Sequence, residues 1–144
     1  MSILPRLARF ATVSIAWYFG DVIDILLEAE ETAPLEEFAT QLGIHRIAII
    51  EAQLQRCRGL LHRRDGELVD AEMALSQSVE LLRSAANPYA LATTLLDRGS
   101  LLVDLGRPTE ATEALREARS LFEGLRATPW IERTDRALAP LVAV

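Results

Sequence analysis

Apolar residues recur every three or four positions along most of the chain, which is the period of an amphipathic α-helix. In the second half this pattern is interrupted at regular points by Gly66, by Asn87 and Pro88, and by Gly106 and Pro108. Glycine can adopt the left-handed conformation that closes a helix, and proline suits a first helical turn. These signals predict helices over residues 44–64, 67–86, 88–105 and 108–126, and a last helix that begins with Trp130, after Thr128 and Pro129, and ends near Pro140.

A block of the sequence is repeated after 40 residues. The first copy contains Arg58, Gly59, Gly66, Ala71, Ala74, Leu75 and Leu82, which correspond to Arg98, Gly99, Gly106, Ala111, Ala114, Leu115 and Phe122 in the second. Repeats of this period are typical of stacked helical hairpins, in which each unit buries its apolar face against the next. The pattern therefore predicts an all-α fold.

The N-terminal part fits this repeat less well. Apolar spacing predicts a helix over about residues 3–19 and another from Asp21, but Gly20 lies 46 residues before Gly66, six more than the repeat. Terminal repeats are often atypical because they cap the array. We therefore expect one domain over residues 1–144 with about seven or eight helices, divided into a degenerate hairpin with an insertion (1–43), two repeats (44–86 and 87–126) and a C-terminal capping helix (127–144).

Composition limits the classes of partner. The chain has 15 basic and 21 acidic side chains and a net charge of −6, which argues against the basic surface that nucleic acid requires. We expect no membrane association, because Asp21 and Asp24 end the apolar run of residues 11–20 before it reaches the ~20 residues of a membrane span. Cys57 is the only cysteine, so no intramolecular disulfide can form, which fits a reduced cytoplasmic setting.

Charge is unevenly distributed along the chain. Residues 21–37 carry seven acids and no base, which we interpret as the solvated face of a helix, since hard cations need carboxylates that converge. Residues 45–64 carry five arginines against Glu51 alone. These guanidinium groups predict either a groove for an acidic peptide or ion pairs with the acidic helix of residues 21–37. The sequence leaves both open.

No set of residues predicts catalysis. The chain shows no nucleophile elbow, phosphate-binding glycine loop or metal-ligand motif. His45 and His62 lack partner residues at ligand spacing, so we interpret neither as a metal ligand and expect no cofactor. Cys57 lies on the apolar side of its helix and is expected to be a buried thiol. We therefore expect a protein without enzymatic activity.

Small and apolar residues fall on the signature positions of a tetratricopeptide repeat, a unit of about 34 residues, when Gly99 is counted as its eighth residue. These are Leu95, Gly99, Leu102, Gly106, Ala111, Leu115 and Ala118, and Gly59 heads a similar earlier unit. The resemblance implies a right-handed superhelical array of antiparallel helical hairpins, in which small residues let paired helices approach closely. It also implies a partner-binding groove along the first helices of the hairpins, lined by Gln53, Arg56, Leu60, Arg63, Thr93, Leu96, Ser100 and Val103, in which Arg56 and Arg63 favour an acidic or C-terminal carboxylate ligand.

Residues 88–138 also resemble the helical-repeat region of large bacterial signalling ATPases, namely LuxR-type, MalT-like regulators and ATPase-linked adenylate or guanylate cyclases. The resemblance rests on Pro88, Tyr89, Leu105, Gly106, Glu110, Ala111, Leu115, Ala118, Phe122, Pro129, Trp130, Glu132 and Arg133. It implies a scaffold or sensor segment of a larger regulator. We therefore expect a non-catalytic protein–protein interaction module; the alternatives are a small-molecule sensor domain, or a self-association (dimerisation) module that uses Trp17, Tyr18 and Phe19.

Overall fold

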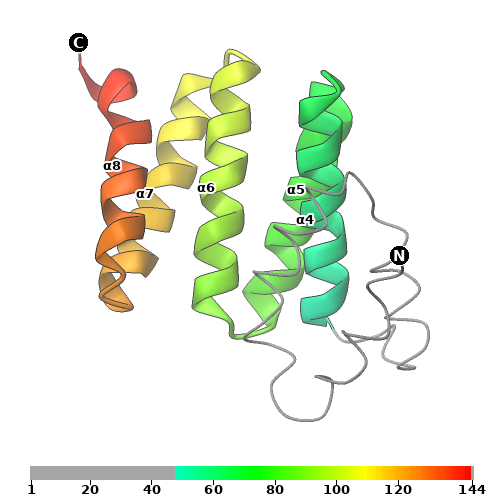
Figure 1. Cartoon of the computed structure of the whole chain (residues 1–144), viewed down its shortest axis with the longest axis horizontal. Coiled ribbons are helices and arrows are strands. Elements are labelled where there is room, and N and C mark those ends of the chain that lie inside the picture. The colour runs from blue at the N-terminus through cyan, green and yellow to red at the C-terminus, as the bar shows by residue number, and fades with distance from the viewer. Residues whose placement is uncertain (1–47, 144) are drawn as a thin grey trace, which may run out of the picture.

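The structure, a computed structural model, describes residues 48–143 of the chain. Over this range it contains no strand and five α-helices: α4 (Ala48–Arg64), α5 (Leu68–Ser84), α6 (Pro88–Asp104), α7 (Pro108–Gly124) and α8 (Thr128–Val142). Consecutive helices run antiparallel (Figure 1). The all-α prediction is confirmed for these residues, and α5, α6 and α7 begin and end within two residues of the predicted positions.

Glycine closes the first helix of each hairpin. Gly66 and Gly106 have φ angles of +82° and +69°, in the left-handed region. This conformation turns the following amide back towards the helix, so that the Glu67 amide donates to the His62 carbonyl at 2.8 Å and the Arg107 amide donates to the Leu102 carbonyl at 2.9 Å. The predicted glycine closures are therefore confirmed.

The helix starts were predicted with mixed success. The Ala90 amide donates to Asn87 Oδ1 at 3.0 Å, so Asn87 caps α6 directly before its predicted start at Pro88. The predicted bounds of α8, from Trp130 to near Pro140, are each short by two residues, because this helix begins at Thr128 and continues past Pro140 to Val142. The repeat places Pro129 at the second helical position, where a backbone amide has no partner within the helix, so proline is tolerated there.

Close contact between paired helices explains why two glycines recur in the repeat. A Cβ atom added at Gly59 would lie 2.7 Å from Leu75 Cγ, and one added at Gly99 would lie 2.6 Å from Leu115 Cγ. Both leucines are fully buried. The prediction that small residues let the helices of each hairpin approach closely is thus confirmed.

Aromatic packing joins the second hairpin to α8. Phe122 is fully buried and stacks on the half-buried Trp130, with ring centroids 5.4 Å apart, while the Tyr89 ring meets Trp130 edge-on at 5.9 Å. Offset stacking and edge contacts are the preferred aromatic geometries. Phe122 is therefore a core residue that links α7 to α8.

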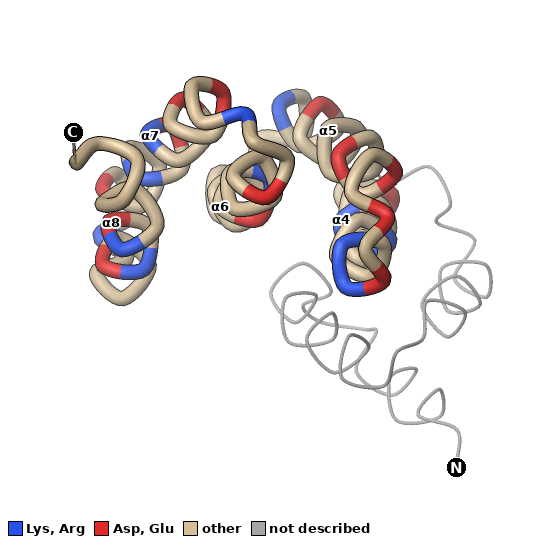
Figure 2. Tube along the Cα trace, turned by 90° about the horizontal axis from the view of Figure 1, so that it is seen from above, with Lys and Arg blue, Asp and Glu red and all other residues tan. Residues whose placement is uncertain are grey.

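The described helices form an arc. Seen from above, α5 and α7 lie on its outer side, and α6 lies on its inner side between α4 and α8 (Figure 2). We call the inward-facing stripes of α4, α6 and α8 the inner surface. The superhelical hand, the total of seven or eight helices, and the division of the chain into domains stay predictions, and the N-terminal hairpin over residues 1–43 lies outside the described residues.

Candidate functional site

The predicted groove residues differ in accessibility along the inner surface. Gln53, Arg56, Thr93 and Leu96 are buried. Further along the same two helices, Leu60, Arg63 and Ser100 are half-buried and Val103 is 43% exposed. The accessible part of the predicted groove is therefore the end nearest the α4–α5 and α6–α7 turns.

Arg56 crosses from α4 to α6, where its Nε donates to Asp97 Oδ2 at 2.6 Å. The two side chains are only 10% and 16% exposed. A charge that is removed from water to this degree is stable only when it is paired, so Arg56 and Asp97 depend on each other. Asp97 was not among the sequence-predicted site residues.

Arg63 repeats this arrangement two turns further along. Its Nε and Nη2 both contact Asp104 Oδ2, at 2.8 and 2.7 Å. This pair is more open to solvent, with side chains 31% and 42% exposed. Each pair joins residues 41 positions apart, so the two ion pairs form a ladder between α4 and α6. The two arginines assigned to an acidic ligand thus already contact carboxylates of the neighbouring repeat, while the proposed pairing with residues 21–37 lies outside the described range.

Two buried polar side chains accompany the ladder. Ser78, which stands where the repeat usually has alanine, donates to the Ala52 carbonyl at 2.7 Å and so joins α5 to α4. Gln53 is 5% exposed, and its Oε1 accepts no hydrogen bond from any described residue. A buried oxygen of this kind normally has a donor. Within residues 48–143, the Gln53 Oε1 atom is therefore a buried acceptor without a donor.

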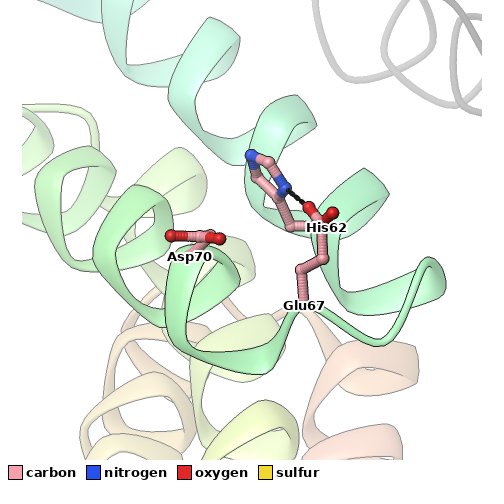
Figure 3. Close-up of side chains that lie close together, drawn as sticks. All are labelled: His62, Glu67 and Asp70. Atoms are coloured by element: carbon pink, nitrogen blue, oxygen red, sulfur yellow. Dashed lines mark hydrogen bonds and ion pairs between the residues drawn. The ribbon is translucent and has the colours of Figure 1, made fainter.

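A second cluster of polar groups lies at the α4–α5 turn. His62, near the end of α4, contacts Glu67 through its Nδ1 atom, and Asp70 on α5 lies beside them (Figure 3). One potential ligand atom from each residue lies within 4.8 Å of the other two. Ligand spacing along the helix of His62 could not predict Glu67 and Asp70, because both follow the turn that brings them back to it.

Cys57 is fully buried, as expected. Burial raises the pKa of its thiol, despite the opposing effect of Arg56 and Arg58. A thiol that is buried and protonated is a poor nucleophile. The interpretation of Cys57 as a buried, packed thiol is confirmed.

Further ion pairs connect α5 with both helices of the second hairpin. Arg98 on α6 contacts Glu72 on α5 at 2.9 Å, and Arg83 contacts Glu117 between α5 and α7 at 2.5 Å. Partial burial of Glu72 raises the pKa of its carboxyl, but hydrogen bonds from Arg98 and Ser76 outweigh this effect and leave the pKa below its usual value. The hydrogen bond from Arg83 likewise lowers the pKa of Glu117. These pairs link the first hairpin to the second.

Comparison with known families agrees with this geometry. The sequence model of the tetratricopeptide repeat matches residues 50–124, which is just over half of the chain. The chain belongs to the tetratricopeptide repeat family. Tetratricopeptide repeats generally mediate protein–protein interaction or scaffolding. Neither a curated protein nor a solved structure gave a significant match.

The matched range ends within the second hairpin, but the tetratricopeptide repeat register continues into α8. Thr94 and Thr134 are both fully buried and donate to the carbonyls of Ala90 and Trp130, each four residues earlier. The helix α8 thus stands where a third repeat would begin. None of the helices within residues 48–143 combines the length and the apolar character that a membrane crossing requires.

Proposed function

We propose that the inner surface of this tetratricopeptide repeat domain binds a protein partner at its accessible end. The observation that carries the proposal is the contrast along the stripe: Gln53, Arg56, Thr93 and Leu96 are buried, whereas Val103 is 43% exposed beside half-buried polar and apolar groups. A surface with an exposed apolar residue among adaptable polar ones suits peptide recognition. The role is scaffolding without catalysis, as is typical of this family.

The partner is proposed to be acidic, with its carboxylates bound near α8. In the repeat register Arg133 and Arg136 stand 40 residues after Thr93 and Leu96, and so extend the same stripe. Both are exposed, and neither forms an ion pair with a carboxylate of the described residues; Arg133 lies over the Trp130 ring at 5.3 Å. Because Arg56 is already occupied by Asp97, these two arginines take over the role that the sequence assigned to it.

We further propose that the domain is part of a larger cytoplasmic bacterial regulator. Support comes from the resemblance of residues 88–138 to the repeat regions of LuxR-type regulators and ATPase-linked cyclases. A cytoplasmic location is consistent with the single cysteine, Cys57.

A matched pair of substitutions tests the binding surface. Peptides are selected from a random displayed library against the full chain, and the affinity of a selected peptide is measured by calorimetry. Val103→Glu on α6 is expected to weaken binding by about tenfold or more, because it puts a carboxylate into an apolar contact and repels an acidic ligand. Val69→Glu introduces the same change on α5, where Val69 is 71% exposed, and should leave the affinity unchanged.

The proposal fails if the two variants behave alike, or if only Val69→Glu weakens binding. Circular dichroism of both variants shows whether each retains its helices. Self-association through Trp17, Tyr18 and Phe19 remains the alternative, and these residues lie outside the described range. Light scattering tests it, since a monomer at every concentration removes the support for self-association. The small-molecule sensor alternative has no observation among the described residues in its favour.

A further inference from the structure

The α4–α5 turn gathers three potential metal ligands from two helices. One potential ligand atom each from His62, Glu67 and Asp70 lies within 4.8 Å of the other two. We propose that these residues bind a first-row divalent transition-metal ion of the zinc type. Neither the family match nor the proposed partner surface accounts for this cluster.

The backbone fixes two of the ligands relative to each other. Gly66 has a φ of +82°, and the Glu67 amide donates to the His62 carbonyl at 2.8 Å across the turn. The Ala71 amide donates to the Glu67 carbonyl at 2.9 Å, so Glu67 is also held at the start of α5. Asp70 follows in the first turn of that helix. The three side chains therefore project from a short, hydrogen-bonded segment rather than from independent loops.

The equivalent turn of the second hairpin has an arginine where this turn has a second acid. There Arg107 and Glu110 occupy the positions equivalent to Glu67 and Asp70, and the Arg107 Nε donates to Glu110 Oε1 at 2.7 Å. Leu102, which is fully buried, replaces His62. In the first turn both positions are acidic, and no arginine within residues 48–143 forms an ion pair with either carboxylate. A bound cation would supply the positive charge that Arg107 provides in the second turn.

The ligand set selects the class of ion. Zinc is bound by imidazole nitrogen and carboxylate oxygen at about 2.0–2.2 Å, which puts neighbouring ligand atoms roughly 3.4 Å apart. The side chains of His62 and Glu67 are 39% and 54% exposed, so small rotations can close the cluster to that spacing. Calcium and magnesium prefer six or more oxygen ligands, which this turn does not offer. Three protein ligands leave room for water on the ion.

The test uses the full chain, freed of metal with a chelator and titrated with Zn²⁺ by calorimetry. We expect one ion per chain, a melting temperature that rises with Zn²⁺ concentration, and visible absorption bands when Co²⁺ replaces Zn²⁺. His62→Leu, which introduces the residue of the second repeat, and Asp70→Asn should each weaken binding by about tenfold or more. Glu113→Gln, an exposed carboxylate on α7, is the matched control and should leave binding unchanged.

Two results would overturn the proposal. One is the absence of Zn²⁺ binding to the unsubstituted chain at about 100 µM, a concentration that detects even weak sites. The other is an affinity that His62→Leu and Asp70→Asn leave unchanged, which would place the ion elsewhere, for example at His45. Circular dichroism shows that both variants retain their helices, and Asp70→Asn on the exposed surface is expected to fold in any case.

Discussion

The hairpins α4–α5 and α6–α7 share a backbone plan but differ in the side chains of their inner stripe. Gly59 against Leu75 and Gly99 against Leu115 make the same close helix contact in both. The inner stripe, in contrast, carries Arg56 and Arg63 in the first hairpin where the second has Leu96 and Val103. The close-contact positions are therefore repeated because every hairpin needs them, whereas the positions of the inner stripe differ between the two hairpins.

The difference also sets how the hairpins join. The first hairpin contributes arginines and the second contributes Asp97 and Asp104, so the α4–α6 junction is held by ion pairs. The junction of α7 with α8 is held by the stacked rings of Phe122 and Trp130. One junction is thus electrostatic and the other largely apolar, and the two should respond differently to substitution.

The largest expected effect comes from the more buried of the two α4–α6 ion pairs, Arg56–Asp97. Asp97→Ala leaves Arg56 without its partner in a site where the side chain is 10% exposed, and should lower the free energy of unfolding by about 3 kcal/mol. Asp104→Ala removes the more exposed pair, Arg63–Asp104, and should lower the free energy of unfolding by less than about 1 kcal/mol. Urea denaturation of both variants measures the difference. Equal losses would mean that burial does not distinguish the two pairs.

The next effect tests whether the two hairpins pack alike. Gly99→Ala puts a Cβ atom 2.6 Å from Leu115 Cγ, and this overpacking should lower the free energy of unfolding by about 1–3 kcal/mol. The higher helix propensity of alanine offsets about 1 kcal/mol of that loss. In a Leu115→Ala background the clash is absent, so the same substitution should become neutral or stabilising. The corresponding cycle at Gly59 and Leu75 should give the same sign. Additive effects in either cycle would contradict the close-contact explanation.

The smallest effect concerns pH. The pKa of Glu117 is lowered in the folded chain by Arg83, so its contribution to stability is present above the unfolded value near pH 4.5 and is lost as the pH falls through the lower folded value. The pair is partly exposed, so this contribution is less than about 1 kcal/mol. Glu117→Gln should therefore reduce the melting temperature slightly at pH 7, and this reduction should shrink as the pH falls below the unfolded value of about 4.5. A reduction that does not change with pH would show that charge is not the cause.

Local patterns predicted the architecture because they act over short distances. Gly66 and Gly106 end helices through their own backbone conformation, and Asn87 caps α6 through a bond three residues long. Ala86 and Arg126 adopt positive φ angles of 51° and 54° at the other turns, and neither residue type signals this. The geometry there is imposed by the packing of the helices that the turns connect.

The site was harder to predict because it depends on how helices face each other. The sequence identified Arg56 and Arg63, but their partners Asp97 and Asp104 lie 41 residues away on another helix. A signal was present, since both pairs of residues are seven positions apart, which is the spacing of one helix face. This shared spacing identifies the pairs only when the face of α6 that meets α4 is known, and that face is a property of the packed array.

The central claim is that a partner binds the accessible end of the inner surface. The most direct measurement is a two-dimensional NMR titration of the isotopically labelled full chain with a selected acidic peptide. We expect the amide shifts to concentrate around Leu60, Arg63, Ser100 and Val103 and to extend to Arg133 on α8. Shifts confined to the outer helices, around Val69 and Met73 of α5, would contradict it.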